Sequence, residues 1–332
     1  MTEISPQTIA EAAAHLQTLR GTMNKVLFGQ EKLIDTVLIG LLARGHLLLE
    51  GLPGLGKTAL VKGLARALEL DSRRVQFTPD LLPGDITGNP ILQEIDGRRQ
   101  FVFQPGPLFT NLVLADEINR ASPKTQAALL EAMQERHVTV MGETHPLPEP
   151  FFVLATQNPI ELEGTYPLPE AQLDRFLFKL EVGRNSVEVL QRIVQHREIG
   201  ADAEIEPVMN IRQLLGLCAT ARAIYLPDAV ANYIARLVDA THEVEGVKFG
   251  ASPRAAIALA AAARASALLH GRPNAAFEDV EALAAPVLQH RIILDYTARL
   301  AGRTPADVVA GLLTSVPKQS KAAPDLLKAA KL

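Results

Sequence analysis

The sequence of 332 residues predicts an α/β protein with a doubly wound parallel sheet, two β-hairpin insertions and a following all-α domain. Three observations support this fold class. Short apolar runs alternate with helical patterns through the first half, which favours a parallel sheet covered by helices on both faces. Two further β-like segments interrupt that alternation. After about residue 185 only helical periodicity remains.

Five apolar runs in the first half have the length of a buried strand. They are residues 46–50, 74–77, 112–115, 151–155 and 176–182. Helices are predicted between them at residues 57–70, 123–135 and 170–173.

The two interruptions are interpreted as β-hairpins inserted into this α/β domain. In residues 91–103, Asp96-Gly97 separates two runs with β character, which is a strong hairpin signal. In residues 137–145, Gly142 occupies the expected turn just before the fourth strand. Neither segment is needed by a minimal doubly wound domain.

The composition changes after Val182, where Gly183-Arg184-Asn185 breaks the pattern. We therefore predict an α/β core domain at residues 1–185 and a C-terminal helical domain at residues 186–332. Its predicted helices are 187–199, 210–222, 227–243, 253–270, 277–289 and 304–315.

Charge and cysteine content exclude several classes of protein. The net charge of −4 gives no electrostatic reason to expect nucleic acid or an anionic membrane as partner. Cys218 is the only cysteine, so no internal disulfide is possible, and the histidines form no zinc-binding motif. The first residues show no signal peptide, and the alanine-rich stretch 255–269 contains Arg264 and is interpreted as a buried helix. These observations predict a cytoplasmic protein without a membrane span.

Residues 51–58 read GLPGLGKT and match the phosphate-loop pattern GxxxxGK[ST] between a predicted strand and a predicted helix. Glycines let several backbone N–H groups face one phosphate, and the helix that follows adds its positive dipole end. We expect Lys57 to reach the β- and γ-phosphates and Thr58 to bind Mg²⁺. The expected nucleotide-binding residues are Gly51, Leu52, Pro53, Gly54, Leu55, Gly56, Lys57, Thr58 and Ala59.

Two acids, Asp116 and Glu117, end the apolar run 112–115. Open α/β sheets bind ligands at the carboxyl ends of their strands, so this pair is expected near the phosphate loop. Asp116 would hold Mg²⁺ and Glu117 would orient or deprotonate the attacking water. Taken alone, the pair would fit an ordinary solvated strand end equally well.

Three further polar residues are candidates for catalysis. Asn158 follows the fourth strand and could hydrogen-bond the γ-phosphate, although Asn-Pro also begins turns. Arg175 precedes the fifth strand and could serve a neighbouring subunit as an arginine finger, or pair locally with Asp174. Arg254 follows Ser252-Pro253 at a helix start, where its charge opposes the helix dipole unless a phosphate is bound.

Together these segments resemble the MoxR family of AAA+ ATPases, over about residues 25–300. GLPGLGKT and LADEINR match the two Walker motifs, ATQNP the first sensor, LDRF the arginine-finger segment and SPR the second sensor. The two hairpins resemble the branch that carries one in helix 2 and one before the first sensor. Phe28, Gly29 and Gln30 resemble the segment that lies near adenine in such proteins.

The resemblance implies ATP and Mg²⁺ as ligands, a hexameric ring with ATP at its interfaces, and chaperone-like remodelling of client proteins. It also implies a partner with a von Willebrand factor A domain. Arg120, in the DEINR segment, is the second choice for the arginine finger. The alternatives are a metal-chelatase ATPase subunit, a nucleic-acid motor using Arg98 and Arg99, and a small-molecule phosphotransferase.

Overall fold

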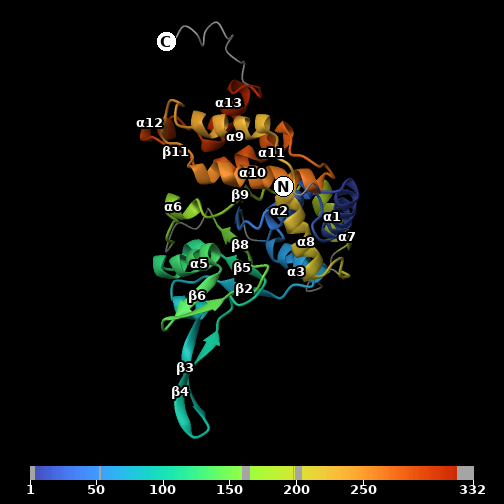
Figure 1. Ribbon diagram of the computed structural model, residues 1–332. Coiled ribbons are helices and arrows are strands. Elements are labelled where there is room, and N and C mark those ends of the chain that lie inside the picture. Colours follow the sequence, from blue (N-terminus) through green and yellow to red (C-terminus); the bar gives the residue numbers. More distant parts are fainter. Residues whose placement is uncertain (1–3, 52–53, 159–164, 197, 199–203, 320–332) are drawn as a thin grey trace, which may run out of the picture.

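A five-stranded parallel sheet forms the centre of the molecule in the computed structural model, which describes residues 4–51, 54–158, 165–196, 198 and 204–319 (Figure 1). The strand order is β2-β5-β8-β1-β9. The strands are β1 (Leu47–Glu50), β2 (Ser72–Gln76), β5 (Leu112–Asp116), β8 (Phe152–Gln157) and β9 (Phe178–Glu181). Each overlaps a predicted run. The carboxyl ends of β1, β5 and β8 meet at one edge of the sheet because these strands are neighbours and parallel.

Alternate residues of each central strand enter two separate hydrophobic cores. In β5, Leu112 and Leu114 face one core while Val113 and Ala115 face the other. The first core contains the helices α1 (Pro6–Val26), α2 (Glu31–Leu42) and α3 (Lys57–Ala67), and the second contains α5 (Pro123–Glu135). The side chains on both faces of the central strands are therefore covered, which confirms the doubly wound prediction.

Both predicted hairpins are present. The first pairs β3 (Gly88–Ile95) with β4 (Arg98–Pro105), and the second pairs β6 (His137–Val140) with β7 (Glu143–Pro146). Asp96 and Gly97 both have positive φ, at 51° and 74°, which is the conformation that a two-residue turn in a twisted hairpin requires. The short helix α4 (Pro83–Thr87) leads into β3.

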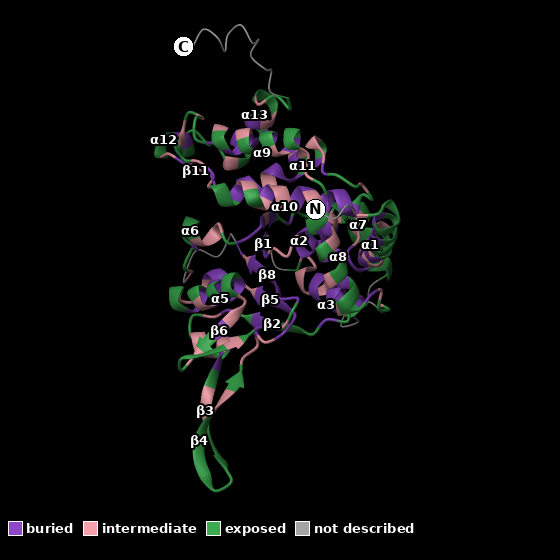
Figure 2. Cartoon of the chain, viewed as in Figure 1, coloured by how far each residue is buried: buried purple, intermediate pink, exposed green. Residues whose placement is uncertain are grey.

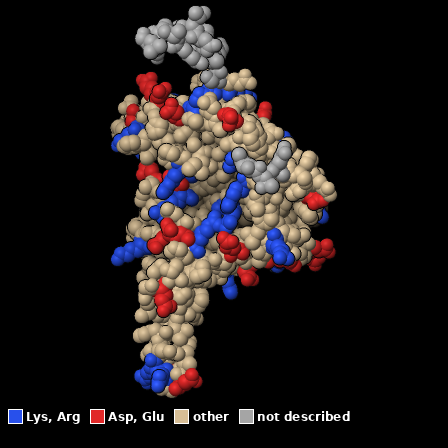
Figure 3. Space-filling view, viewed as in Figure 1, with Lys and Arg blue, Asp and Glu red and all other residues tan. Residues whose placement is uncertain are grey.

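The first hairpin projects far from the body of the molecule, and nearly all of its outer part is exposed (Figure 2). Charges of both signs lie at its far end (Figure 3). The sequence there is Asp96-Gly97-Arg98-Arg99. None of the strand residues of this hairpin belongs to either hydrophobic core, so it contributes little to their burial.

After β9 the chain is helical, with one addition to the predicted all-α domain. A short antiparallel ribbon joins β10 (Val247–Phe249) to β11 (Ile293–Leu294), which are too short to show a strand period in the sequence. The short helix α6 (Glu170–Leu173) precedes β9. The helices after β9 are α7 (Val187–His196), α8 (Ile211–Ala223), α9 (Asp228–Ala240), α10 (Pro253–Leu269), α11 (Phe277–Leu288), α12 (Tyr296–Leu300) and α13 (Pro305–Ser315).

The alanine-rich helix α10 lies in the middle of this helical half (Figure 1) and packs against α2, α8, α9 and α11. Small side chains allow neighbouring helix backbones to approach closely, and nine residues of α10 are buried. The first hydrophobic core continues from α1 through the sheet into α13. Within the described part of the chain, no helix combines the length and the apolar character needed to cross a membrane.

Candidate functional site

The phosphate loop connects β1 to α3, as the sequence predicts. Gly54 and Gly56 have φ of 83° and 84°, a left-handed conformation that side-chain-bearing residues rarely adopt. Gly56 is the N-cap of α3 and brings no side chain to cap it, so the first N–H groups of the helix are available to an anion. Leu52 and Pro53 lie outside the described residues.

Lys57 begins α3, and its ammonium group donates a 2.7 Å hydrogen bond to the Gly51 carbonyl oxygen. Burial lowers the pKa of Lys57, and the charges of Asp116, Glu117 and Glu50 oppose that effect. A half-buried cation at the positive end of a helix dipole is electrostatically unfavourable. A bound phosphate would remove this conflict.

A polar cavity of about 280 Å³ opens beside this loop at the carboxyl edge of the sheet. It brings together residues from the phosphate loop, β2, β5 and β8. Its lining residues are Gly51, Gly54, Gly56, Lys57, Thr58, Arg74, Asp116, Glu117, Thr156, Gln157 and Asn158.

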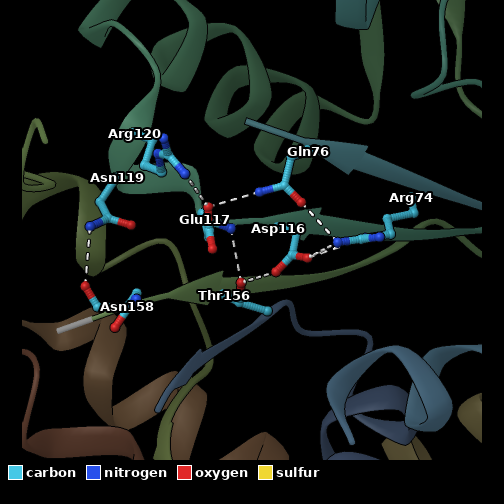
Figure 4. A network of polar contacts seen from close by, with 8 residues as sticks. All are labelled: Arg74, Gln76, Asp116, Glu117, Asn119, Arg120, Thr156 and Asn158. Atoms are coloured by element: carbon cyan, nitrogen blue, oxygen red, sulfur yellow. Dashed lines mark hydrogen bonds and ion pairs between the residues drawn. The ribbon is translucent and has the colours of Figure 1, made fainter. Parts of the chain in front are cut away.

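Asp116 is held by two partners that lie on its two sides (Figure 4). Arg74 donates to Oδ2 from Nη2 at 2.7 Å and from Nε at 3.2 Å. The Thr156 hydroxyl donates to Oδ1 at 2.6 Å. The carboxylate therefore remains in the cavity with a fixed orientation.

Glu117 has a left-handed backbone with φ of 56°, which turns the chain sharply after β5. Its Oε2 accepts hydrogen bonds from Gln76 at 2.8 Å and from Arg120 at 3.0 Å, and its N–H donates to the Thr156 hydroxyl at 2.9 Å (Figure 4). Thr156 thus connects the backbone of one acid to the carboxylate of the other.

Sequence reasoning missed Arg74, Gln76 and Thr156 as members of the site. Arg74 and Gln76 lie in a strand whose sequence, SRRVQ, has no motif. The signal that could have found them is topological, since β2 pairs with β5 in parallel and brings Gln76 level with Asp116. Polar residues at the carboxyl end of β2 must then face the acids.

Asn158 is 8% exposed, follows β8 directly and is one of the residues that line the cavity. Its carbonyl oxygen accepts a 3.4 Å hydrogen bond from the Asn119 amide. This position, facing the phosphate loop across the cavity, is the one that a residue sensing the γ-phosphate would need.

A second cavity of about 280 Å³ lies on the other side of the phosphate loop and shares Gly54 and Gly56 with the first. Phe28, Gln30, Leu55 and Ala59 are among its lining residues. Its partly apolar lining, which also includes Val26, Leu27, Ile193 and Ile205, suits a flat base.

The residues that precede α2 are fixed around this second cavity. The Arg192 guanidinium lies 4.9 Å above the Phe28 ring, and the Gln30 amide donates to Asn185 at 3.1 Å. Gly29 does not line the cavity. Its φ of 66° and the Val189 side chain, which would collide with a Cβ here, both favour glycine at this position. Residues from α7 and from the loop before it thus complete the cavity.

Neither Arg175 nor Arg254 lines either cavity. Arg175 is exposed and lies on a separate groove formed with Glu131 and Glu135 of α5. Arg254 is 61% exposed at its side chain, and its guanidinium is 3.9 Å from the carboxylate of Asp174. Arg254 is thus connected to the Arg175 segment through Asp174, the residue before Arg175.

The start of α10 differs from the sequence expectation in one detail. Ser252 is its N-cap and Pro253 its first residue, as predicted, but the Ser252 side chain makes no capping hydrogen bond. Its hydroxyl instead donates to Asp174 at 3.4 Å. The Ser252 side chain therefore connects the helical half to the sheet half instead of capping α10.

Known protein families match both halves of the chain. Residues 46–178 match the model described as ATPase family associated with various cellular activities (AAA), and residues 239–312 match the AAA lid domain. These two matched segments contain the polar cavity and helix α10, respectively.

Similar proteins cover almost the whole chain. It is 41% identical over 348 aligned residues to Chaperone MoxR1 of Mycobacterium tuberculosis, covering 99% of this chain and 92% of that one. It is 45% identical over 295 residues to the uncharacterized protein YeaC of Bacillus subtilis, covering 89% and 92%. A candidate ATPase from Cytophaga hutchinsonii of known crystal structure is 38% identical, with a TM-score of 0.88 over 95% of this chain and 98% of the other.

Proposed function

The chain is a MoxR-type AAA+ ATPase, and we propose that it hydrolyses ATP with Mg²⁺ at the interfaces between subunits of a ring, most simply a hexamer. ATP hydrolysis and a chaperone-like role follow from membership of this family. The proposal adds the metal, the ring and the assignment of individual residues. It also adds remodelling or activation of client proteins together with a partner that carries a von Willebrand factor A domain.

The observation that carries the ring is the position of Arg175. The polar cavity holds Lys57, Asp116, Glu117 and Asn158, whereas Arg175 is exposed and outside it. Transfer of a phosphoryl group gains about 10³–10⁵ in rate from an arginine near the γ-phosphate. A second copy of the chain could bring its Arg175 to this cavity without any change in its own site.

Arg120 is less suited to that role. Its guanidinium is 3.0 Å from Glu117 of the same chain, so it is already part of its own site. We therefore assign Arg175 as the arginine finger and Arg120 as a residue that orients Glu117.

The oxygen donors in the cavity fit Mg²⁺. This ion prefers hydroxyl and carboxylate oxygens together with phosphate, and Thr58 and Asp116 offer one of each at the same cavity. When bound, the ion would neutralise charge on the phosphates. Asp116 would have to share or exchange its hydrogen bonds from Arg74 to bind it.

The remaining assignments follow from what each side chain can reach. Backbone N–H groups of the loop and of α3 would bind the β-phosphate, with Lys57 reaching towards the γ-phosphate. Glu117, held by Gln76 and Arg120, would orient the attacking water and accept its proton. Asn158 would bind that water or the γ-phosphate. Arg254 would leave Asp174 for the phosphates when the helical half closes on the nucleotide.

Mixing two inactive variants tests the ring. Arg175→Ala should bind ATP normally but hydrolyse it poorly, because the lost charge acts mainly in the transition state. Lys57→Ala lacks ATP affinity but keeps its arginine finger. A mixture should therefore regain part of the activity, and the gain should rise with protein concentration.

Arg120→Ala is the matched control for this mixture. If Arg120 serves its own site, both Arg120→Ala and Lys57→Ala lack a working nucleotide site, and their mixture stays inactive. Absence of rescue for Arg175→Ala, with mixed assemblies shown by size measurement, would contradict a role for Arg175 in trans.

A further inference from the structure

The segment that carries Arg175 is held by three consecutive residues from the helical half. Gln289, His290 and Arg291 follow α11 directly. The Gln289 amide donates to the Lys179 carbonyl at 2.7 Å, and the His290 ring donates from Nε2 to the Phe176 carbonyl at 3.1 Å. The end of α11 is thus fastened to the beginning of β9.

Arg291 makes the densest of these contacts. Its Nε donates to the Asp174 carboxylate at 2.6 Å, and its Nη2 donates to the carbonyls of Asp174 at 3.0 Å and Phe176 at 2.7 Å. Its Nη1 also donates to the Leu177 carbonyl at 3.3 Å. A single guanidinium therefore binds the residue before Arg175 and the two residues after it.

This arginine is part of the interior. Its side chain is 3% exposed, and burial lowers its pKa, against which the Asp174 carboxylate acts. A buried charge left without its partner costs several kcal/mol, so the pair resists separation. Arg291 and the Arg175 segment should consequently move together.

The other oxygen of Asp174 has weaker partners. Ser252 donates to Oδ2 at 3.4 Å and the Arg254 guanidinium is 3.9 Å away, with Arg254 largely exposed. Arg254 can therefore leave this carboxylate while Arg291 stays bound. Asp174, in the segment that carries Arg175, thus contacts both the start of α10 and Arg291, shortly after the end of α11.

We propose that Asp174 and Arg291 are positioning residues for Arg175, so that the helical half of each subunit sets where its arginine finger reaches in the next. This inference rests on the proposed role of Arg175 in trans. It adds the physical connection by which closure of one subunit on its own nucleotide alters hydrolysis in its neighbour.

Arg291→Lys tests this connection. Lysine keeps the charge but cannot hold a carboxylate and several carbonyls at once. The variant should bind ATP like the parent, while kcat falls by at least about 10-fold, since a misplacement of 1 Å can cost about 10²-fold. Arg272→Lys is the matched control, because Arg272 also pairs with a buried aspartate of the helical half, Asp279, but contacts nothing near Arg175. It should keep the parent rate.

Mixing experiments separate positioning from a general defect. Arg291→Lys mixed with Lys57→Ala should regain activity, since the latter supplies a correctly held finger. Mixed with Arg175→Ala it should not, since both then lack a working finger. Rescue of Arg175→Ala by Arg291→Lys would overturn the inference, because it would place the defect in the variant's own nucleotide site. So would a parent-like kcat, or failure of Lys57→Ala to rescue Arg291→Lys in assemblies shown to be mixed.

If Arg291→Lys does not fold, the double change Asp174→Asn with Arg291→Gln removes both charges together and leaves no buried charge unpaired. The same two mixtures then apply. Failure of the Arg175→Ala and Lys57→Ala mixture itself would count against the finger, and with it against the connection. Success of that mixture with rescue of Arg175→Ala by the Arg291 variant would count against the connection alone.

Discussion

The Arg74 guanidinium and the Asp116 carboxylate form a direct ion pair in the polar cavity, with Nη2 and Oδ2 separated by 2.7 Å. Thr156 donates to the other carboxylate oxygen, so both oxygens of the candidate metal ligand already accept hydrogen bonds from protein donors. A metal ion that binds Oδ2 of Asp116 would compete with Arg74. This competition has a measurable consequence that does not involve turnover.

Arg74→Gln should tighten binding of a divalent cation to the nucleotide-free protein. We expect an effect of a few-fold only, since the Arg74 side chain is 54% exposed and exposed pairs contribute little. Mn²⁺ used in place of Mg²⁺ allows the measurement by electron paramagnetic resonance. Arg73→Gln removes the same charge one residue away, outside the cavity, and should leave the affinity unchanged. Equal effects of the two variants would show that only net charge matters.

Lys57→Ala should weaken ATP binding by at least about 10-fold, because a charge-assisted contact to phosphate is worth roughly 1.5–3 kcal/mol. The fold should survive, since Lys57 is not part of either hydrophobic core. Calorimetric titration with ATP measures the change, and thermal melting monitors the fold. Lys124→Ala, on the exposed start of α5, is the control. Unchanged ATP affinity in Lys57→Ala would remove the phosphate-loop assignment.

Glu117→Gln should bind Mg²⁺ and ATP but lose at least about 10²-fold in hydrolysis, because the amide cannot accept the proton of the attacking water. Phosphate release and equilibrium nucleotide binding, measured on the same sample, separate the two effects. Glu143→Gln changes an exposed glutamate in β7 and should behave like the parent. A Glu117→Gln variant that turns over at the parent rate would assign water activation to another group.

Two buried histidines predict loss of stability in mild acid. Burial lowers the pKa of His46 to about 4 and that of His290 to about 3 from 6.5. Below about pH 6.5 these two histidines are therefore protonated in the unfolded chain but remain neutral in the folded chain. As a result, the free energy of unfolding falls as pH falls towards 4. Each histidine contributes a slope of at most about 1.4 kcal/mol per pH unit in that window.

Urea unfolding at several pH values checks this expectation. His290→Gln should flatten the dependence between about pH 6 and pH 5 by the share of one histidine. His15→Gln, at an exposed position in α1, should leave the slope unchanged. An equal slope in parent and His290→Gln would mean that His290 is not excluded from protonation in the folded state.

The elements predicted from sequence were those whose signal is local. A short contiguous stretch of sequence specifies each of two features, the apolar strand β5 and the Asp96-Gly97 turn, and both occur as expected. The acids after β5 and the phosphate loop could be brought together because parallel strands share a carboxyl edge. Their assignment to catalysis remains a prediction.

Contacts that depend on distant segments could not be predicted. Arg291 and Asp174 are 117 residues apart, and nothing in either local sequence indicates the other. The same holds for Arg74 and Asp116, which meet only because β2 is placed beside β5. Long-range pairing of charged side chains has no periodicity, so only the assembled fold reveals it.

Because the two cavities share a wall, we expect the two parts of a nucleotide to bind in separate cavities. Gly54 and Gly56 face a polar compartment on one side and a partly apolar one on the other. Adenosine should therefore bind weakly in the partly apolar cavity and pyrophosphate weakly in the polar cavity. Both should be able to bind at the same time. In ADP the two fragments are covalently linked, so once one part has bound, the other binds intramolecularly. The affinity for ADP should therefore exceed the affinity for adenosine or for pyrophosphate by a factor set by the effective concentration. Gly54 and Gly56 thus separate the sites for the two parts of the nucleotide, and the covalent bond that passes this loop combines their binding free energies.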